Sequence, residues 1–367
     1  MSGTNKYLIV SSEFPPAPGG IGNHAYNLAM GLFQKKHSVH VISIYRNLNA
    51  DNEFDLELPF PVERVMSGKF FAKTKLIFKT IKKLSTDSNL TVIASGLAML
   101  IICGLYSSIF QNGKTKFVLI AHGIDINPSS VIYKSLVSIT INRFDRIIAV
   151  SSYTAGKIKG VHKSKIKVIN NGFNPKQIDE NGMIAKPHDE YPSLLTVGSV
   201  TYRKGQINVI RALPFLVKKY PKIHYHMVGI DKDKNELITL AKKLDVVQYI
   251  TFHGPLSNKL LHQQLLKTDI FLMLSNHTKE GDFEGFGIAV LEANFLGIPA
   301  VGALESGLVD AIKDGDSGIL INPQNVEELL IAIPRLLSDL DRYRERAKAH
   351  SLTFLWDKVI NRYCEVL

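Results

Sequence analysis

Apolar runs of strand length recur along the chain, and segments with helical spacing of apolar residues separate them. The strand-length runs lie at 6–10, 39–44, 90–94, 117–121, 146–150, 193–197 and 269–275. After the first run, Ile21, Ala25, Leu28 and Leu32 recur every three or four residues, which predicts a helix. Strands that alternate with helices predict buried parallel sheets, and hence an α/β fold.

The longest stretch without a charged residue, 90–110, raises the question of a membrane span, because its 21 residues could cross a bilayer. Ser95 and Gly96 divide it into a first part of strand length and a second part of helix length. Another apolar strand follows at 117–121. The pattern therefore predicts a strand–helix–strand unit of a buried sheet rather than a transmembrane helix.

The length of 367 residues suits two domains, and the 45% of hydrophobic residues can supply two cores. Turn-forming residues cluster after Asn171-Gly172, with prolines at 175 and 187. This cluster predicts a linker between about 173 and 192. We place the first domain at 1–175 and the second at 176–349.

The net charge of +11 is concentrated in the first domain. Residues 1–175 carry 21 basic and 9 acidic side chains, whereas the remaining residues carry 23 and 24. A basic excess predicts a surface that faces an acidic partner. Because no zinc spacing, ribonucleoprotein motif or basic–aromatic repeat is present, nucleic acid is disfavoured and an anionic membrane is favoured.

The cysteines and the amino-terminal sequence bear on the compartment. Cys103 and Cys364 lie far apart with no metal-ligand spacing, and no signal-peptide pattern precedes the strand at 6–10. Both features favour a reducing cytoplasm.

Residues 69–84 form a basic amphipathic pattern when plotted at about 100° per residue. One arc holds Phe70, Phe71, Thr74, Ile77, Phe78, Ile81 and Leu84. The opposite arc holds Lys69, Lys75, Lys79, Lys82 and Lys83, with Lys73 at its edge. Such a helix suits an anionic bilayer surface, which would place Lys75, Lys79, Lys82 and Lys83 towards the membrane. The alternative is a peripheral helix whose apolar face covers the domain core, and a partly lifted helix would satisfy both.

Residues 282–297 (DFEGFGIAVLEANFLG) contain the chain's most informative pattern. A strand precedes the loop with Gly285 and Gly287, and a helix follows it, so backbone N–H groups and a positive helix end would face one point. That geometry suits phosphate. Glu284 and Glu292 cannot bind phosphate directly, but they can accept hydrogen bonds from hydroxyl groups. A phosphate beside hydroxyl groups describes a nucleotide sugar, whereas the alternative is a buried helix with two incidental carboxylates.

Three other positions could face a ligand. Gly19-Gly20 lies between a strand and a helix, and His122 follows the strand at 117–121, where open α/β sheets bind ligands. Arg203 and Lys204 offer a guanidinium and an ammonium that could neutralise a diphosphate. Each of these features alone is commonly structural, because a lone histidine often packs in a core and an Arg-Lys pair is often solvated.

Glu284 and Glu292 form a Glu-x7-Glu pair inside EGFGIAVLEA, which resembles the signature of the retaining glycosyltransferases of family 4, or glycosyltransferase group 1. The resemblance covers nearly the whole chain and is most specific at 196–205 and 280–320. It implies the GT-B fold, in which two doubly wound, Rossmann-like domains face each other across a cleft. It also implies that a final helix at 350–367 packs back on the first domain.

The resemblance assigns a role to each candidate. His122 and Glu284 would be catalytic and would contact the transferred sugar, and Glu292 would hold the ribose. The donor-binding set would comprise Gly20, Arg203, Lys204, Gly285, Phe286, Gly287, Ile288 and Glu292. The family's Gly-Arg…Lys-Gly loop has an arginine where this chain has Ser199, so Arg203 would take over that position.

The implied activity is transfer of a hexose from a nucleoside-diphosphate sugar to a glycan or lipid-linked acceptor, with retention at the anomeric carbon. The process served would be cell-envelope polysaccharide or glycolipid synthesis, at the inner face of the membrane. No cofactor and no metal are expected, because Asp231-x-Asp233 and Asp314-x-Asp316 resemble a metal motif of another glycosyltransferase fold by letters only. A non-catalytic GT-B partner, or a GT-B epimerase or hydrolase, stays open as an alternative. The base, sugar and acceptor are not specified.

Overall fold

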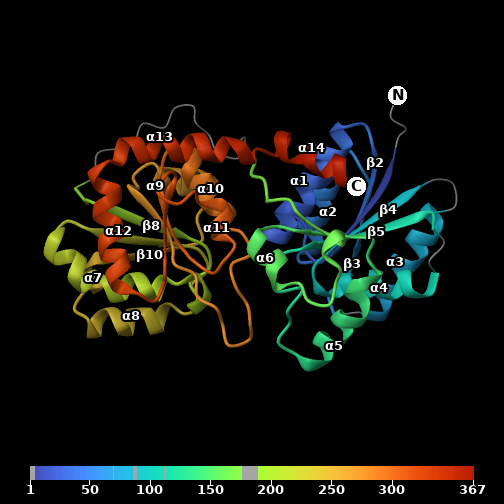
Figure 1. The fold of residues 1–367 in the computed structure, drawn as a ribbon, viewed down its shortest axis with the longest axis horizontal. Helices are drawn as coiled ribbons and strands as arrows, with labels where there is room; N and C mark the ends of the chain where they lie inside the picture. Colours follow the sequence, from blue (N-terminus) through green and yellow to red (C-terminus); the bar gives the residue numbers. More distant parts are fainter. Residues whose placement is uncertain (1–4, 69, 86–88, 111–112, 176–188) are drawn as a thin grey trace. The chain divides into compact units, whose positions relative to one another are not determined.

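The computed structural model describes residues 5–68, 70–85, 89–110, 113–175 and 189–367 (Figure 1). The chain forms two compact units, one of Met1–Gly172 with Trp356–Leu367 and the other of Phe173–Leu355. Most of the predicted linker, 176–188, and the predicted helix residue Lys69 lie outside the described residues.

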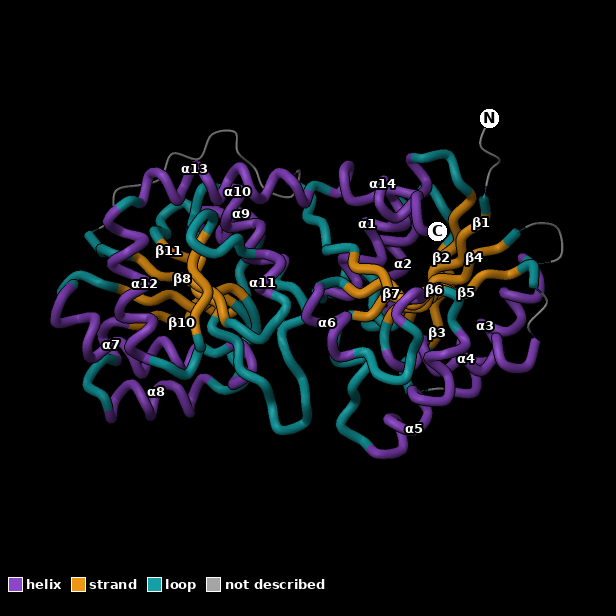
Figure 2. Tube along the Cα trace, in the orientation of Figure 1, coloured by secondary structure: helices purple, strands orange, loops and turns teal. Residues whose placement is uncertain are grey.

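The first unit alternates strands and helices, as the sequence pattern predicts (Figure 2). Its strands are β1 (Lys6–Ser11), β2 (Ser38–Ile44), β3 (Val62–Val65), β4 (Leu90–Ser95), β5 (Thr115–Ala121), β6 (Arg146–Ala149) and β7 (Ile166–Val168). Its helices are α1 (Gly20–Gln34), α2 (Leu48–Leu56), α3 (Phe70–Leu84), α4 (Leu97–Phe110), α5 (Val131–Thr140), α6 (Ser152–Lys157) and α14 (Trp356–Val366).

All strand pairs of the first sheet are parallel, in the order β3-β2-β1-β4-β5-β6-β7. Leu8 and Val10 of β1 face a core shared with α3, α4 and α5, whereas their neighbours Tyr7 and Ile9 are buried on the opposite face. The strand order reverses between β1 and β4, so the loops after these strands diverge to opposite faces. In open α/β sheets, ligands commonly bind outside the carboxyl ends of the strands at such a reversal.

The second unit repeats this plan with its own elements. Its strands are β8 (Ser193–Val197), β9 (His224–Val228), β10 (Ile250–Gly254), β11 (Ile270–Met273), β12 (Ala300–Ala303) and β13 (Gly318–Ile321). Its helices are α7 (Gln206–Lys219), α8 (Lys234–Lys243), α9 (Asn258–Leu265), α10 (Ile288–Phe295), α11 (Leu308–Ala311), α12 (Val326–Ser338) and α13 (Leu340–Ser351).

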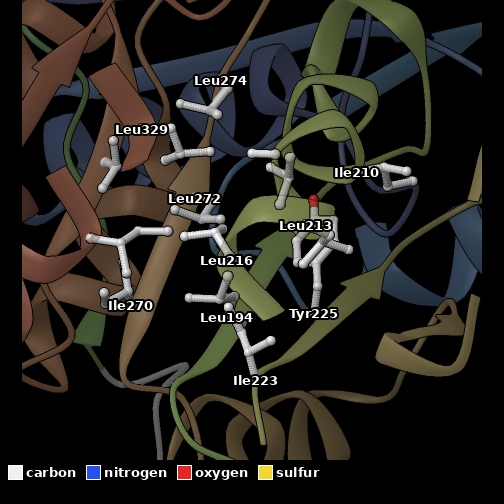
Figure 3. Close-up of a cluster of buried hydrophobic side chains, with 14 of the residues drawn as sticks. Leu194, Ile210, Leu213, Leu216, Ile223, Tyr225, Ile270, Leu272, Leu274 and Leu329 are labelled. Carbon is white, nitrogen blue, oxygen red and sulfur yellow. The ribbon is translucent and has the colours of Figure 1, made fainter. Parts of the chain in front are cut away.

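The second sheet is also parallel, in the order β10-β9-β8-β11-β12-β13, and its order reverses between β8 and β11. One face carries a core built with α7, α8 and α12, part of which Figure 3 shows around Leu194, Tyr225 and Leu272. The other face carries a second core built with α9, α10 and α11. The prediction of two doubly wound parallel-sheet domains is therefore confirmed.

The carboxyl-terminal helix is shorter than the sequence pattern predicts. α13 extends to Ser351, and α14 begins only at Trp356. The buried residues of α14 are Trp356, Val359, Ile360 and Tyr363, the spacing of one helical face. This face packs on α1, where the Cβ of any residue replacing Gly31 would lie 2.8 Å from Ile360 Cδ1.

The uncharged stretch 90–110 forms β4 and α4, both largely buried, as predicted. In the part of the chain that the structure describes, no helix has the length and apolar character needed to span a bilayer.

The apolar arc of α3 divides into two parts. Ile77 and Ile81 are fully buried in the first unit's core, whereas Phe70 is 41% exposed and Phe71 is 87% exposed. The lysines Lys75, Lys79, Lys82 and Lys83 are all exposed. Core packing therefore explains the carboxyl-terminal half of the arc, but it does not explain the phenylalanines of the first turn.

Candidate active site

Two cations and two carboxylates meet at the carboxyl edge of the second sheet. The Nζ of Lys204 lies 2.6 Å from Glu284 Oε2, and the Nη1 of Arg203 lies 3.0 Å from the same oxygen. The Nε of Arg203 also pairs with Asp282 Oδ2 at 3.1 Å. Arg203 and Lys204 follow β8, whereas Asp282 and Glu284 follow β11, so the cluster lies where the strand order reverses.

Glu284 is held as a carboxylate by its neighbours. Burial alone would raise the pKa of Glu284, but the charges and hydrogen bonds of Lys204 and Arg203 outweigh burial and lower it to about 2. Burial raises the pKa of Asp282, and the charge of Glu284 adds to this effect, while Arg203 opposes it. The cluster therefore contains one firmly ionised carboxylate that can accept hydrogen bonds at neutral pH.

The loop that presents Arg203 and Lys204 is fixed by its backbone. Thr201 caps the short 3₁₀ turn Tyr202–Lys204, and the following Gly205 has a φ of 77°, in the left-handed region. The backbone N–H of Asn276 donates to the Arg203 carbonyl at 2.8 Å, and its side chain donates to the Tyr202 carbonyl at 2.9 Å. These bonds tie the loop to the segment after β11.

The loop before α10 is also closely packed. The N–H of Gly307 donates to the Glu284 carbonyl at 2.7 Å, and the Cβ of any residue replacing Gly307 would lie 1.9 Å from the Gly285 carbonyl oxygen. Gly287 begins the helix with a φ of 93°, and no side chain caps this end. The Phe286 ring is buried, 5.8 Å from the ring of Phe354, so only the backbone of Phe286 can meet a ligand.

Glu292 lies on the half-exposed side of α10, together with Ile288 and Ala289. These three residues form a stripe along α10, which runs from the uncapped start of the helix to the Glu292 carboxylate one turn further along. Burial raises the pKa of Glu292 to about 6, and no hydrogen bond or charge among the described residues contributes to this shift. The Glu292 carboxylate is thus available to accept hydrogen bonds from a ligand.

We expect Glu292→Gln to raise the free energy of unfolding at pH 7–8 by about 1 kcal/mol. This value is smaller than the pKa shift alone implies, because Glu292 is half-buried and solvent screens its charge. The raised pKa means that the folded state holds more protons than the unfolded state between pH 4.5 and about 6, so wild-type stability falls as the pH rises through this window. The advantage of the variant should be present at pH 8 and absent at pH 4. Urea unfolding at both pH values measures it, and an equal effect at both would contradict the assignment.

His122 lies at the carboxyl end of β5 in the first unit, where the sequence predicted it. One ring nitrogen, Nε2, lies 2.8 Å from the hydroxyl oxygen of Ser95 at the end of β4. The carboxylate of Asp125 accepts hydrogen bonds from the backbone N–H groups of His122 and Gly123 and so fixes the turn. Burial lowers the pKa of His122 to about 4, so the imidazole is neutral at pH 7.

Buried aromatic rings pack beside the ring of His122. The ring of His24, on α1, lies edge-on to the ring of His122 at 5.2 Å, and its Nε2 lies 2.7 Å from the hydroxyl oxygen of Tyr363. The ring of Trp356 lies 5.3 Å from the ring of His24. Trp356 and Tyr363 belong to α14, the last helix of the chain. The position of His122 thus depends on this helix.

Gly20 is the first residue of α1, in the same unit as His122. A Cβ at this position would have no atom within 4 Å, so local packing does not require a glycine there.

The structure brings together four predicted residues, Arg203, Lys204, Glu284 and Gly285, in the second unit. Sequence reasoning missed the residues that hold the candidates in place, which are Asp282, Asn276, Gly307, Ser95, His24 and Asp125. Asp282 stands two positions before Glu284, and this spacing could have indicated it. Asp125 stands three positions after His122, so local spacing could have indicated it as well. The other four lie far along the chain from the candidates that they hold and leave no local signal.

The two Asp-x-Asp sequences make local contacts in the structure. Asp233 accepts a hydrogen bond from the backbone N–H of Tyr202 at 2.8 Å, and Asp231 pairs with Lys234. Asp314 accepts from the backbone N–H of Leu320, and Asp316 pairs with Lys313.

Two doubly wound sheets with a basic, glycine-lined site at the switch point of the second define a protein of the GT-B class. The fold is similar to that of HepE from Anabaena, crystallised with UDP and glucose, with a TM-score of 0.77 at 20% identity over 98% of each chain.

Family models identify the class more closely. A model described as "Glycosyl transferases group 1" matches residues 178–351, and one described as "Glycosyltransferase Family 4" matches residues 18–177. The chain belongs to these glycosyltransferases, which confirms the predicted resemblance.

Curated relatives agree along nearly the full length. A glycosyltransferase of Methanocaldococcus jannaschii is 24% identical, over 91% of this chain and 89% of its own. The GDP-mannose-dependent monoacylated alpha-(1-6)-phosphatidylinositol monomannoside mannosyltransferase of Corynebacterium glutamicum is 24% identical, over 92% and 90%.

Proposed function

We propose that this glycosyltransferase moves a hexose from a nucleoside-diphosphate sugar to a glycan or lipid-linked acceptor, with retention at the anomeric carbon and without a metal ion. The observation that carries the proposal is the convergence of Lys204 and Arg203 on Glu284, beside the uncapped start of α10. The two cations and the backbone amides can bind a diphosphate, whereas the ionised carboxylate of Glu284 can accept hydrogen bonds from sugar hydroxyls.

The cations keep donors for a diphosphate while they hold Glu284. Lys204 uses one N–H of its ammonium on Glu284, and Arg203 uses Nε and Nη1 on the two carboxylates. The remaining N–H groups can bind phosphate oxygens, since an ammonium has three donors and a guanidinium five. As the bond to the sugar breaks, these groups stabilise the negative charge that grows on the leaving diphosphate.

His122 would orient the transferred sugar as a neutral group. With Nε2 bonded to Ser95, its Nδ1 has no partner among the described residues and can exchange a hydrogen bond with a sugar hydroxyl. A neutral imidazole adds no positive charge beside the electron-poor anomeric carbon. Attack by the acceptor on the face that the diphosphate leaves would retain the configuration.

Calorimetric titration with UDP, GDP, ADP and dTDP, first with a chelator and then with magnesium, tests the donor site. We expect micromolar binding of one nucleotide without metal. Incubation of the matching nucleotide sugar with a candidate acceptor should then give a glycoside whose anomeric configuration, read by NMR, equals that of the donor. Strict dependence on magnesium, or an inverted product, would contradict the proposal, and free sugar alone would indicate a hydrolase.

The acceptor side of the proposal includes an anionic membrane surface. The corynebacterial relative is named for a phosphatidylinositol mannoside acceptor. In this chain Phe71 is 87% exposed on α3, and Val131 and Ile132 are 77% and 72% exposed on α5. The helices α3 and α5, which carry these residues, both pack against α4 (Figure 1), and Lys75 and Lys79 of α3 are exposed.

Free thiols are consistent with a cytoplasmic location, which contact with the inner face of the membrane would require. Cys103 and Cys364 are both unpaired cysteines in the structure, as expected of a reducing environment. We therefore propose a cytoplasmic location at the inner face of the membrane.

We expect the double variant Phe71→Ser, Ile132→Ser to bind vesicles that contain anionic lipid at least about tenfold more weakly, because each apolar side chain contributes roughly 1–2 kcal/mol when buried. Reversal of Lys79, Lys82 and Lys83 to Glu should weaken binding further and remove its salt dependence. Ile331→Ser serves as a control, because this residue of the second unit is 67% exposed. Vesicle sedimentation measures the binding, and an equal effect of the control would refute the surface.

A further inference from the structure

Two histidines and a glutamate gather near the amino-terminal end of β9, an inner strand of the second sheet. His224 and His226 stand two positions apart on β9, so their side chains share one face. Glu190 precedes β8, and its Oε2 lies 2.8 Å from His226 Nε2, while its Oε1 lies 3.8 Å from His224 Nδ1. The three ligand atoms, one from each residue, lie within 4.8 Å of one another.

In each histidine, the ring nitrogen that faces away from Glu190 already has a hydrogen-bond partner. His224 Nε2 lies 2.8 Å from Thr251 Oγ1, and His226 Nδ1 lies 3.1 Å from His253 Nε2. The register between β9 and β10 shifts at His253, and such a bulge re-aims a side chain. Outer partners that fix ring orientation and tautomer are what metal-binding histidines require.

The histidines of this cluster are partly desolvated, which lowers their pKa values. Burial lowers the pKa of His226 to about 4, although the hydrogen bond and charge of Glu190 oppose the shift. Burial also lowers the pKa values of His224 and His253, and the charge of Glu190 opposes both shifts. A histidine binds a metal ion through a neutral ring nitrogen, and the positions of the three ligand atoms, rather than these pKa values, support a metal site.

The cluster is separate from the residues of the donor site. His224 is the first residue of β9, and Glu190 lies just before β8, so both mark the amino-terminal end of the sheet. Lys204 and Glu284 follow the carboxyl ends of β8 and β11. β9 has five residues and spans about 16 Å, and Glu190 and His224 lie at the end opposite to the donor-site residues.

We propose that Glu190, His224 and His226 bind one divalent transition-metal ion, with zinc the best match, in a site that ties the segment before β8 to the amino-terminal half of β9. Two imidazole nitrogens and one carboxylate oxygen form a common zinc ligand set, and water would complete a tetrahedron. The ion stabilises the second unit rather than taking part in sugar transfer. The spacing in sequence does not indicate this site, because Glu190 lies 36 positions before His226.

Titration of the full-length, chelator-treated protein with zinc chloride tests the site. We expect one zinc per chain by native mass spectrometry, a Kd at or below about 10 μM, and a rise in Tm on zinc addition. Co²⁺ in place of zinc should give the visible absorption of a four-coordinate site. Transfer or nucleotide binding should change less than about twofold, because the ion lies away from the switch point.

Variants distinguish this site from incidental zinc binding. Glu190→Gln and His226→Gln should each weaken zinc binding at least about tenfold and abolish the Tm rise. His162→Gln changes an exposed histidine of the first unit and should leave both unchanged. Because Glu190 is part-exposed, Glu190→Gln keeps the test valid if His226→Gln fails to fold. Absence of binding at 100 μM zinc, taken as about ten times the expected Kd, or binding that both variants retain, would overturn the proposal.

Discussion

Glu284→Gln is expected to lower kcat for sugar transfer by about 100-fold or more, the usual cost of losing one charged contact to the transition state. The same change removes a negative charge that Lys204 and Arg203 now share. The affinity for the nucleoside diphosphate should therefore stay constant or rise up to about tenfold, since a unit charge at contact distance near a surface is worth roughly 1 kcal/mol or more. A fall in turnover with a gain in product affinity separates a sugar-orienting carboxylate from a general structural one.

The measurement combines steady-state kinetics with calorimetric titration of the nucleotide that the protein prefers. Glu280→Gln is a matched control, because Glu280 is exposed in the same loop and should leave both quantities unchanged. Wild-type kcat in Glu284→Gln would exclude Glu284 from the reaction. Loss of nucleotide affinity instead of a gain would show that Glu284 acts mainly by positioning the two cations.

Gly205→Ala is expected to cost the protein about 3 kcal/mol of stability or more, because two separate penalties combine. The backbone of Gly205 has a φ of 77°, which strains any residue with a Cβ. That Cβ would also lie 1.7 Å from the Leu274 carbonyl oxygen, so the loop or β11 would have to move. Lys204 is the preceding residue, and its contact with Glu284 should be lost together with the stability.

Gly160→Ala separates the two penalties. Gly160 has a φ of 71°, but a Cβ there would have no atom within 4 Å, so it carries the strain without the clash. We expect this variant to lose about 1 kcal/mol, and the difference between the two variants measures the close approach of Gly205 to β11. Urea unfolding followed by fluorescence provides both values. Equal losses would show that the backbone at Gly205 relaxes freely.

The sequence alone predicted most of the fold, because burial on both faces of a parallel sheet leaves a local signature. Continuous apolar runs marked β1, β4, β5 and β11, and glycines marked several of the strand–helix turns. The residues that we propose to contact a donor also stand in the loops after strands, where spacing along the chain reflects spacing in the fold. Glu284, Gly285, Gly287 and Lys204 could therefore be named as candidates without a structure.

The amphipathic segment shows where the sequence pattern was insufficient. The apolar arc of α3 looks uniform in sequence, but Ile77 and Ile81 are buried while Phe71 is exposed. Periodicity gives the direction of a side chain around its helix. It does not say how far along the helix the underlying core extends, which depends on β4 and α4 beneath it.

Tertiary structure alone decided which residues support the site and which form the proposed zinc site. Gly307 reaches the carbonyl of Glu284, Tyr363 reaches His24, and Glu190 reaches His226, each across a long separation in sequence. The periodicities of helices and strands describe neighbours within one element, so they contain no record of such contacts. The sequence by itself determined the elements, the family and the residues at the strand ends. The partners of those residues were set by the order of strands in the two sheets, since that order brings distant segments into contact.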